Sequence, residues 1–256
     1  MRKRVMLVSL FLAPIHSALA QNAADAYWGA AQMASSRAAL KNNHGGQINS
    51  LILGERLESQ FRDGDAETVW EAQGWVGGDI HKAWFKTEGD FSDEDGRFEE
   101  IELQALYSRA ISAFWDVQFG LRHDARPDPS RNYAVVGFQG LAPYWFELDA
   151  QLFLSDQGDV SVRLEGEYEL RLTQRLILQP RVELNAAFSD DVEIGVGSGL
   201  SEADVGLRLR YEIRREFAPY LGVSWIRQFG ATRDFSTAED RSVDELAWVA
   251  GVRIWF

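Results

Sequence analysis

Apolar and polar residues alternate with a period of two from about residue 50 to the end of the chain. The segment from Val160 to Leu170 is typical: one face holds Val160, Val162, Leu164, Gly166, Tyr168 and Leu170, and the other holds Ser161, Arg163, Glu165, Glu167 and Glu169. A helix would mix these two sets, whereas a strand separates them. The pattern therefore confines most of the chain to β-strands.

Continuing the pattern gives about twelve strands of roughly ten residues each. They are expected near residues 50–62, 68–77, 81–91, 98–110, 114–123, 132–142, 144–155, 159–172, 175–188, 203–214, 217–229 and 244–256. This length and an even number of strands are typical of an all-β, antiparallel, up-and-down transmembrane β-barrel.

A soluble β-sandwich would also alternate, so the connections between strands decide between the two folds. Alternate connections are short, at residues 78–80, 111–113, 143, 173–174 and 215–216, and the long ones, 124–131, 189–202 and 230–243, fall between them. Short periplasmic turns with longer external loops are the outer-membrane pattern. Aromatic residues near predicted strand ends and the final Phe256 fit interfacial girdles and a terminal barrel-assembly signal.

The first segment has the features of an export signal. Arg2, Lys3 and Arg4 precede an apolar run over residues 5–15, and Ala18-Leu19-Ala20 offers a small-residue cleavage site. The run is too short to span a membrane. We therefore expect a cleaved signal peptide at 1–20, a flexible periplasmic arm at 21–49 and a barrel at 50–256, in the outer membrane of a Gram-negative cell.

Composition narrows the chemistry. The chain has 39 Asp and Glu against 26 Lys and Arg, a net charge of −13, and so would repel a nucleic acid. With no cysteine, 4 His and 3 Met, soft metal ligands are scarce. A charged partner should be a cation.

The same alternation predicts two regions rich in charged side chains. One is an external rim, which could concentrate cations or bridge through divalent ions to lipopolysaccharide. It holds Asp63, Asp65, Glu67, Asp93, Glu94, Asp95, Asp156, Asp159, Asp190, Asp191, Glu193, Glu239, Asp240 and Asp244. The other is the lumen, where acidic and basic side chains occur together. They are expected to pack as ion pairs, and the alternative is a path for cations along the acidic side chains. It holds Glu71, Gln73, Lys82, Lys86, Glu88, Glu100, Glu102, Gln104, Asp116, Arg122, Glu147, Asp149, Gln151, Arg163, Glu165, Glu167 and Arg208.

No enzyme motif stands out. There is no H-x-x-x-H pair, no G-x-S-x-G and no phosphate-binding or dinucleotide loop. His123, Asp124 and Ser130 could form a lipase-like set on the outer wall, but Ser130 follows Pro127 and Pro129 in a turn. We therefore expect no enzymatic activity, with an outer-membrane lipid hydrolase as the remote alternative.

Several segments resemble the copper resistance protein B family. They are QGWVGGD at 73–79, ALYSRAISAFWDVQFGLR at 105–122, the run from Gln139 to Leu184 that includes TQRLILQP, GLRLRYEIRREFAPYLGVSW at 206–225, and GVRIWF at 251–256. The resemblance covers about residues 50–256. It implies an outer-membrane barrel that acts in copper tolerance, usually beside a periplasmic multicopper oxidase.

Many family members carry a long Met- and His-rich periplasmic extension, and this arm holds only Met33 and His44. We therefore expect weak copper binding, with export or exclusion of excess copper from the periplasm. The candidate metal ligands combine the soft ligands of the arm with lumen carboxylates: Met33, His44, Glu88, Glu102, Glu147, Asp149 and Glu165. Expected partners are membrane lipid, lipopolysaccharide, the barrel assembly machinery and a multicopper oxidase, and the alternative function is a general porin or structural barrel without metal selectivity.

Overall fold

The computed structural model describes residues 24–62, 65–239 and 241–256. The chain divides into two compact units, one ending at Gln47 and one spanning Ile48–Phe256. The first holds helices α1 (Asp25–Trp28) and α2 (Ala30–His44), within the segment expected to be a flexible arm. None of the helices that the structure describes is long and apolar enough to cross a membrane.

A bidentate ion pair joins the two helices of this unit. Arg37 Nη1 lies 2.6 Å from Asp25 Oδ1, and Arg37 Nη2 donates to the other oxygen at 3.1 Å. This hydrogen bonding lowers the pKa of the Asp25 carboxyl below its usual value. Both groups are solvent-accessible, so the pair fixes local geometry and adds little stability.

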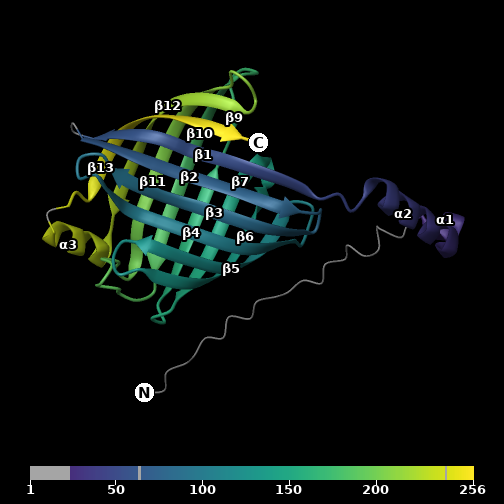
Figure 1. Cartoon of the computed structure of the whole chain (residues 1–256), viewed down its shortest axis with the longest axis horizontal. Helices are drawn as coiled ribbons and strands as arrows, with labels where there is room; N and C mark the ends of the chain where they lie inside the picture. Colours follow the sequence, from purple (N-terminus) through teal and green to yellow (C-terminus); the bar gives the residue numbers. More distant parts are fainter. Residues whose placement is uncertain (1–23, 63–64, 240) are drawn as a thin grey trace, which may run out of the picture. The chain divides into compact units, whose positions relative to one another are not determined.

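The second unit is a closed antiparallel barrel of twelve strands (Figure 1). The strand bounds are β1 (Asn49–Arg62), β2 (Asp65–Gly77), β3 (His81–Ser92), β4 (Arg97–Ala110), β5 (Trp115–Arg126), β6 (Arg131–Ala142), β7 (Phe146–Ser155), β8 (Val160–Glu167), β9 (Leu170–Arg171), β10 (Leu176–Ala187), β11 (Gly199–Tyr211), β12 (Phe217–Gln228) and β13 (Asp244–Trp255). Short β9 continues β8, because both pair with β10. Pairing of β1 with β13, from Leu53↔Trp255 to Phe61↔Trp248, closes the barrel and confirms the predicted fold class.

The connections gather at two ends of the barrel. The turn end holds residues 78–80, 111–114, 143–145 (with the 3₁₀ turn η2, Pro143–Trp145), 172–175 and 212–216, and the loop end holds 93–96, 127–130, 156–159, 188–198 and the described part of 229–243. The two longest connections, 188–198 and 229–243 with helix α3 (Gly230–Ala238), both lie at the loop end, as predicted. The loop expected at 124–131 shrinks to 127–130, because β5 continues to Arg126.

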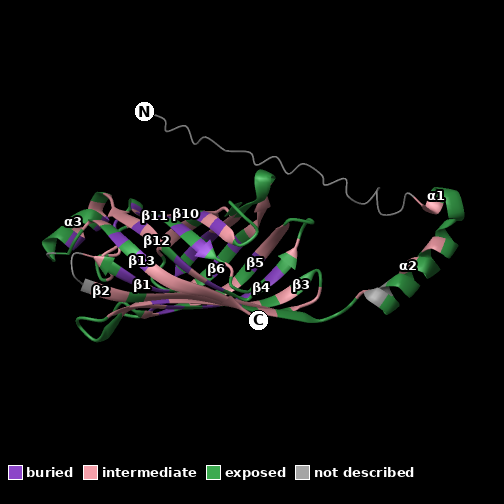
Figure 2. Ribbon diagram, turned by 90° about the horizontal axis from the view of Figure 1, so that it is seen from above, coloured by how far each residue is buried: buried purple, intermediate pink, exposed green. Residues whose placement is uncertain are grey.

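The two faces of the barrel wall follow the alternation in the sequence. Large apolar side chains point outward and are exposed, such as Leu121 at 69% and Trp248 at 69%. Polar side chains on the other face point into the lumen and are buried, such as Arg210 at 1%. Figure 2 shows buried and less buried positions alternating along the strands. This inversion of a soluble core is what a barrel surrounded by lipid requires.

Gly120 of β5 shows how closely neighbouring strands pack. A Cβ at this position would lie 2.1 Å from the Ala105 carbonyl oxygen and 2.8 Å from Leu106 Cα, both on β4. Gly120→Ala should therefore force the two strands apart and lower the free energy of unfolding by about 1–3 kcal/mol. Urea unfolding in detergent micelles, followed by tryptophan fluorescence, measures this.

Gly166→Ala is the matched control for that change. Only Leu148 Cδ2, at 3.3 Å, lies within 4 Å of its added methyl group, and this flexible side chain can move. The same unfolding midpoint for both variants would contradict the packing argument.

Candidate functional site

Carboxylates lie side by side on neighbouring strands, with their side chains in the lumen. Glu71, Glu88 and Glu102 are register partners on β2, β3 and β4. Asp149, Glu165 and Glu183 are register partners on β7, β8 and β10. Like charges directly opposite one another destabilise a sheet, so these rows require cations between them.

Two arginines, Arg163 and Arg181, supply part of that charge. Arg163 of β8 pairs with Glu88 and reaches Glu102 on β4, with Nη2 3.1 Å from Oε2. Arg181 of β10, only 4% exposed in its side chain, contacts four carboxylates: Glu165 and Glu183 at 2.6 Å each, Asp204 at 3.3 Å and Glu71 at 3.6 Å. The ion-pair packing expected of the lumen is therefore present.

This network of ion pairs leaves a cavity of about 450 Å³ that reaches the turn end beside Phe114 and Leu141. Nine carboxylates and three cationic side chains line it: Glu55, Glu71, Glu88, Glu102, Asp116, Glu147, Asp149, Glu165 and Glu167, with Lys82, Lys86 and Arg163. Carboxylates thus outnumber cations three to one in a confined space. Such a surface raises the local concentration of cations.

Several of these carboxylates lack a cationic partner. Within the described part of the chain, no Lys, Arg or His nitrogen lies within 4 Å of a carboxylate oxygen of Glu55, Glu147 or Glu167. Glu55 accepts only from Gln73 Nε2, at 2.7 Å. Asp149 pairs with Lys86 through Oδ2, but its buried Oδ1 has no hydrogen-bond partner. The unpartnered oxygens of these carboxylates are free to coordinate a cation or to accept a hydrogen bond from its bound water.

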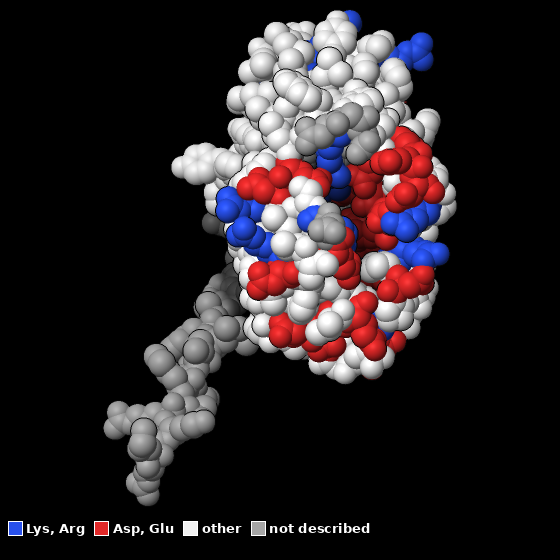
Figure 3. Space-filling view, turned by 90° about the vertical axis from the view of Figure 1, so that its left-hand side faces the viewer, with Lys and Arg blue, Asp and Glu red and all other residues white. Residues whose placement is uncertain are grey.

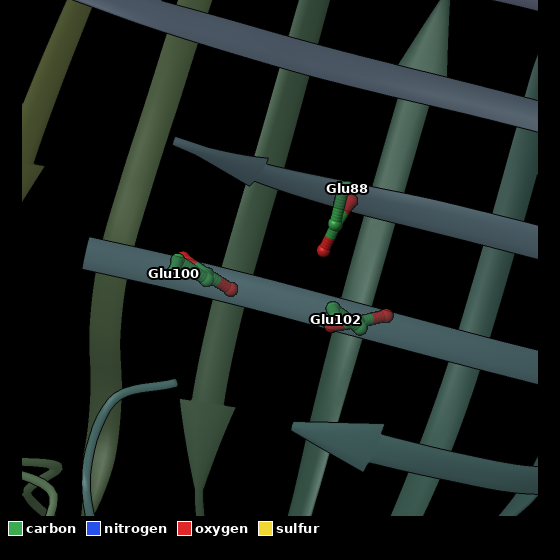
Figure 4. Close-up of side chains that lie close together, drawn as sticks. All are labelled: Glu88, Glu100 and Glu102. Carbon is green, nitrogen blue, oxygen red and sulfur yellow. The ribbon is translucent and has the colours of Figure 1, made fainter. Parts of the chain in front are cut away.

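Two of the cavity carboxylates, Glu88 and Glu102, belong to a closer group. Glu88 of β3 and Glu100 and Glu102 of β4 each bring one oxygen within 4.8 Å of the others (Figure 4). Glu102 also pairs with Arg122 at 2.6 Å, so an ion bound here would compete with Arg122 and Arg163.

The donors that line the cavity suit some copper ions and not others. They are carboxylate, amide and hydroxyl oxygens, with no thioether, thiolate or imidazole among the lining side chains. Oxygen donors fit Cu(II) and other divalent ions, whereas Cu(I) prefers sulfur and imidazole.

The structure brings together five of the seven candidate ligands. Glu88, Glu102, Glu147, Asp149 and Glu165 all line the cavity. Met33 and His44 lie on helix α2 of the other unit, and the His44 side chain is outside the described part. At 1.5 Å per residue, the two backbone positions are about 16 Å apart along one helix.

The remaining histidines of the barrel face outward. His81 Nδ1 lies 2.5 Å from the Tyr107 hydroxyl, and both residues are exposed. His123 Nδ1 lies 2.9 Å from Asn132 Oδ1. Among the described residues His123 makes no hydrogen bond to Ser130, so the lipase-like set is not assembled.

Glu55 is the cavity carboxylate that alternation missed. The register of β1 shifts between Gly54 and Arg56, so two successive residues face the lumen. Arg56 pairs there with Glu71 at 2.6 Å while Glu55 bonds to Gln73. A β-bulge breaks strict alternation, and a glycine inside a strand, here Gly54, is the sequence signal that marks one.

The loop end is acidic, as predicted. Figure 3 shows acidic side chains around a hollow in which further acidic and basic side chains are visible. Asp191 and Glu193 anchor the 188–198 loop to Arg131 of β6, at 3.1 Å and 2.6 Å. In the same loop, hydrogen bonds from Ser198 lower the pKa of Asp190. Asp63 and Asp240 lie outside the described residues.

Together the fold and the charged lumen define an outer-membrane β-barrel. A family model described as "Copper resistance protein B precursor (CopB)" matches residues 48–256. The chain therefore belongs to the copper resistance protein B family, and it lies in the outer membrane.

Similar proteins agree with this membership. Copper resistance protein B of Escherichia coli is 46% identical over 213 residues, which is 83% of this chain and 71% of that protein. Copper resistance protein B homolog of Pseudomonas syringae pv. tomato is 41% identical over 226 residues, covering 86% and 76%. The solved structure of the NanC porin shares the fold, with a TM-score of 0.52 and 12% identity, over 80% of this chain and 99% of that one.

Proposed function

We propose that this barrel contributes to copper resistance by binding Cu(II) weakly in its lumen and passing it outward from the periplasm. The observation that carries the proposal is the cavity at the turn end, where nine carboxylates meet three cationic side chains. Membership of a family named for copper resistance supports copper as the ion.

Glu88, Glu102, Glu147, Asp149 and Glu165 are the proposed ligands. Carboxylate oxygens bind Cu(II) more strongly than Zn(II) under the general affinity order for divalent metals, so oxygen ligands alone can favour copper. Flexible carboxylates that already share their charge with Lys86 and Arg163 hold an ion weakly. Weak sites suit passage, because conduction needs release as well as binding.

The arm and the partners complete the proposal. Met33 and His44 would act as separate, single soft ligands on α2. The acidic loop end would meet lipopolysaccharide through divalent ions, the barrel assembly machinery would insert the barrel, and a multicopper oxidase would act beside it. The role is non-enzymatic.

Binding by the purified protein tests the ligands directly. Glu147→Gln/Asp149→Asn/Glu165→Gln should weaken Cu(II) binding by about tenfold or more, since ~1.4 kcal/mol is lost per factor of ten. Titration calorimetry of the full chain in detergent measures it. Asp93→Asn/Glu94→Gln/Glu239→Gln removes the same charge from exposed positions at the loop end and should leave the affinity unchanged. Equal weakening by both triple variants would mean that net charge, not the cavity, holds the ion.

Metal content of cells tests the direction of transport. A strain that lacks the gene should accumulate copper but not zinc under copper load, and the wild-type gene should correct this where the cavity triple variant does not. Mass spectrometry of total copper and zinc gives the answer. Parallel changes in both metals would favour a general porin, and no change in either would end the export proposal.

A further inference from the structure

Four exposed arginines gather on two neighbouring turns at the turn end. Arg171 and Arg175 flank the turn between β9 and β10, and Arg214 and Arg215 lie in the turn between β11 and β12. Pairing of β10 with β11, starting at Leu176↔Tyr211, places the two turns side by side. The chain as a whole has a net charge of −13, so a cluster of four arginines contrasts with its acidic composition.

These arginines shape a groove. A depression of about 750 Å³ is lined by all four together with Thr173, Gln174, Glu212 and Ile213. A second one beside it is lined by Arg171, Arg215, Arg253 and Trp255 among others. Within the described residues, no carboxylate oxygen lies within 4 Å of Arg175, Arg214 or Arg215, while Arg171 has one distant partner, Glu169 at 3.6 Å.

The groove faces the barrel mouth and not the lipid. Arg171 is the register partner of Ile177, which is fully buried on the inner side of β10. The neighbouring Leu170 and Leu172 take the opposite side and are exposed where lipid would cover them. A partner must therefore approach from the aqueous side at the turn end.

We propose that Arg171, Arg175, Arg214 and Arg215, the arginine patch, form the docking surface for a soluble protein with an acidic face. Guanidinium groups bind carboxylates in a two-pronged geometry, and unpaired ones at a groove keep that capacity for a partner. The acidic loop end repels the same partner, so only the turn end can receive it. Residues 24–47 of this chain contain one acidic residue, Asp25, which is already paired with Arg37, so they lack the acidic surface of the proposed partner.

A polyanion that carries only carboxylates is a direct probe of the patch. The full chain is placed in nanodiscs of zwitterionic phosphatidylcholine, which leave both ends open, and poly-L-glutamate binding is measured by biolayer interferometry. Wild type should bind, with an affinity that falls as salt rises from 50 to 200 mM, because the attraction is electrostatic. Arg175→Gln/Arg214→Gln/Arg215→Gln should weaken binding by about tenfold or more.

Arg97→Gln/Arg233→Gln/Arg241→Gln is the matched control, since it removes three exposed arginines elsewhere in the barrel unit. It should bind poly-L-glutamate as wild type does. Heat-modifiable migration on SDS gels confirms that each variant is folded. The proposal is overturned if both triple variants bind equally. It is also overturned if wild type ignores poly-L-glutamate but retains phosphatidylglycerol through these arginines in mixed nanodiscs, because the patch would then be a lipid contact.

Discussion

Replacing Arg181 with methionine should lower the free energy of unfolding by about 3–5 kcal/mol, the usual cost of leaving buried charges without their partner. Arg181 is nearly inaccessible and lies within 4 Å of Glu71, Glu165, Glu183 and Asp204. Its loss would leave these carboxylates facing one another in the lumen with less compensating charge. Urea unfolding in detergent micelles measures the change.

Two further variants separate this effect from a simple loss of packing. Arg97→Met, whose side chain is 67% exposed, should shift stability by less than about 0.5 kcal/mol. Adding Glu165→Gln and Glu183→Gln to Arg181→Met should restore part of the lost stability, since two of the stranded charges disappear. If Arg181→Met unfolds at the same urea concentration as wild type, the network of ion pairs does not stabilise the barrel.

The strand order and the two faces of the wall were predictable because one rule controls both. A residue every second position must face lipid or lumen, and lipid admits few charges, so Glu165 and Arg163 could be assigned to the lumen from the sequence alone. The rule failed at Glu55, where a bulge at Gly54 turns two successive residues inward. It also set β5 too short, since Asp124 pairs with Arg122 inside the lumen and the strand continues to Arg126.

Which lumen residues meet across the barrel could not be predicted. Alternation places Glu88 and Arg163 on the same inner face, but they are 75 positions apart and belong to β3 and β8. Their contact depends on the barrel's diameter and stagger, which are properties of all twelve strands together. The group of Glu88, Glu100 and Glu102 has a more local origin, because Glu88 and Glu102 are register partners on the adjacent strands β3 and β4.

We expect the contacts of Arg163 to determine whether the lumen conducts ions. It comes from β8, pairs with Glu88 and Glu102 on the facing wall, and borders the inner end of the cavity that opens at the turn end. Arg163→Ala should remove both the obstruction and its positive charge. We expect a several-fold rise in single-channel conductance in planar bilayers, with cations preferred because Glu88, Glu102 and Glu183 would then line the path.

Three further variants are compared with Arg163→Ala in the same conductance measurement. Arg97→Ala, at an exposed position outside the cavity, should conduct as wild type does. Arg163→Ala/Glu88→Gln/Glu102→Gln should keep the larger conductance but lose much of the preference for cations, because the opening would remain while the charge would not. Arg163→Gln, a milder change, should give an intermediate current if the barrel with alanine folds poorly. A wild-type current in all Arg163 variants would show that the lumen is blocked elsewhere, and copper would then need a route other than the cavity.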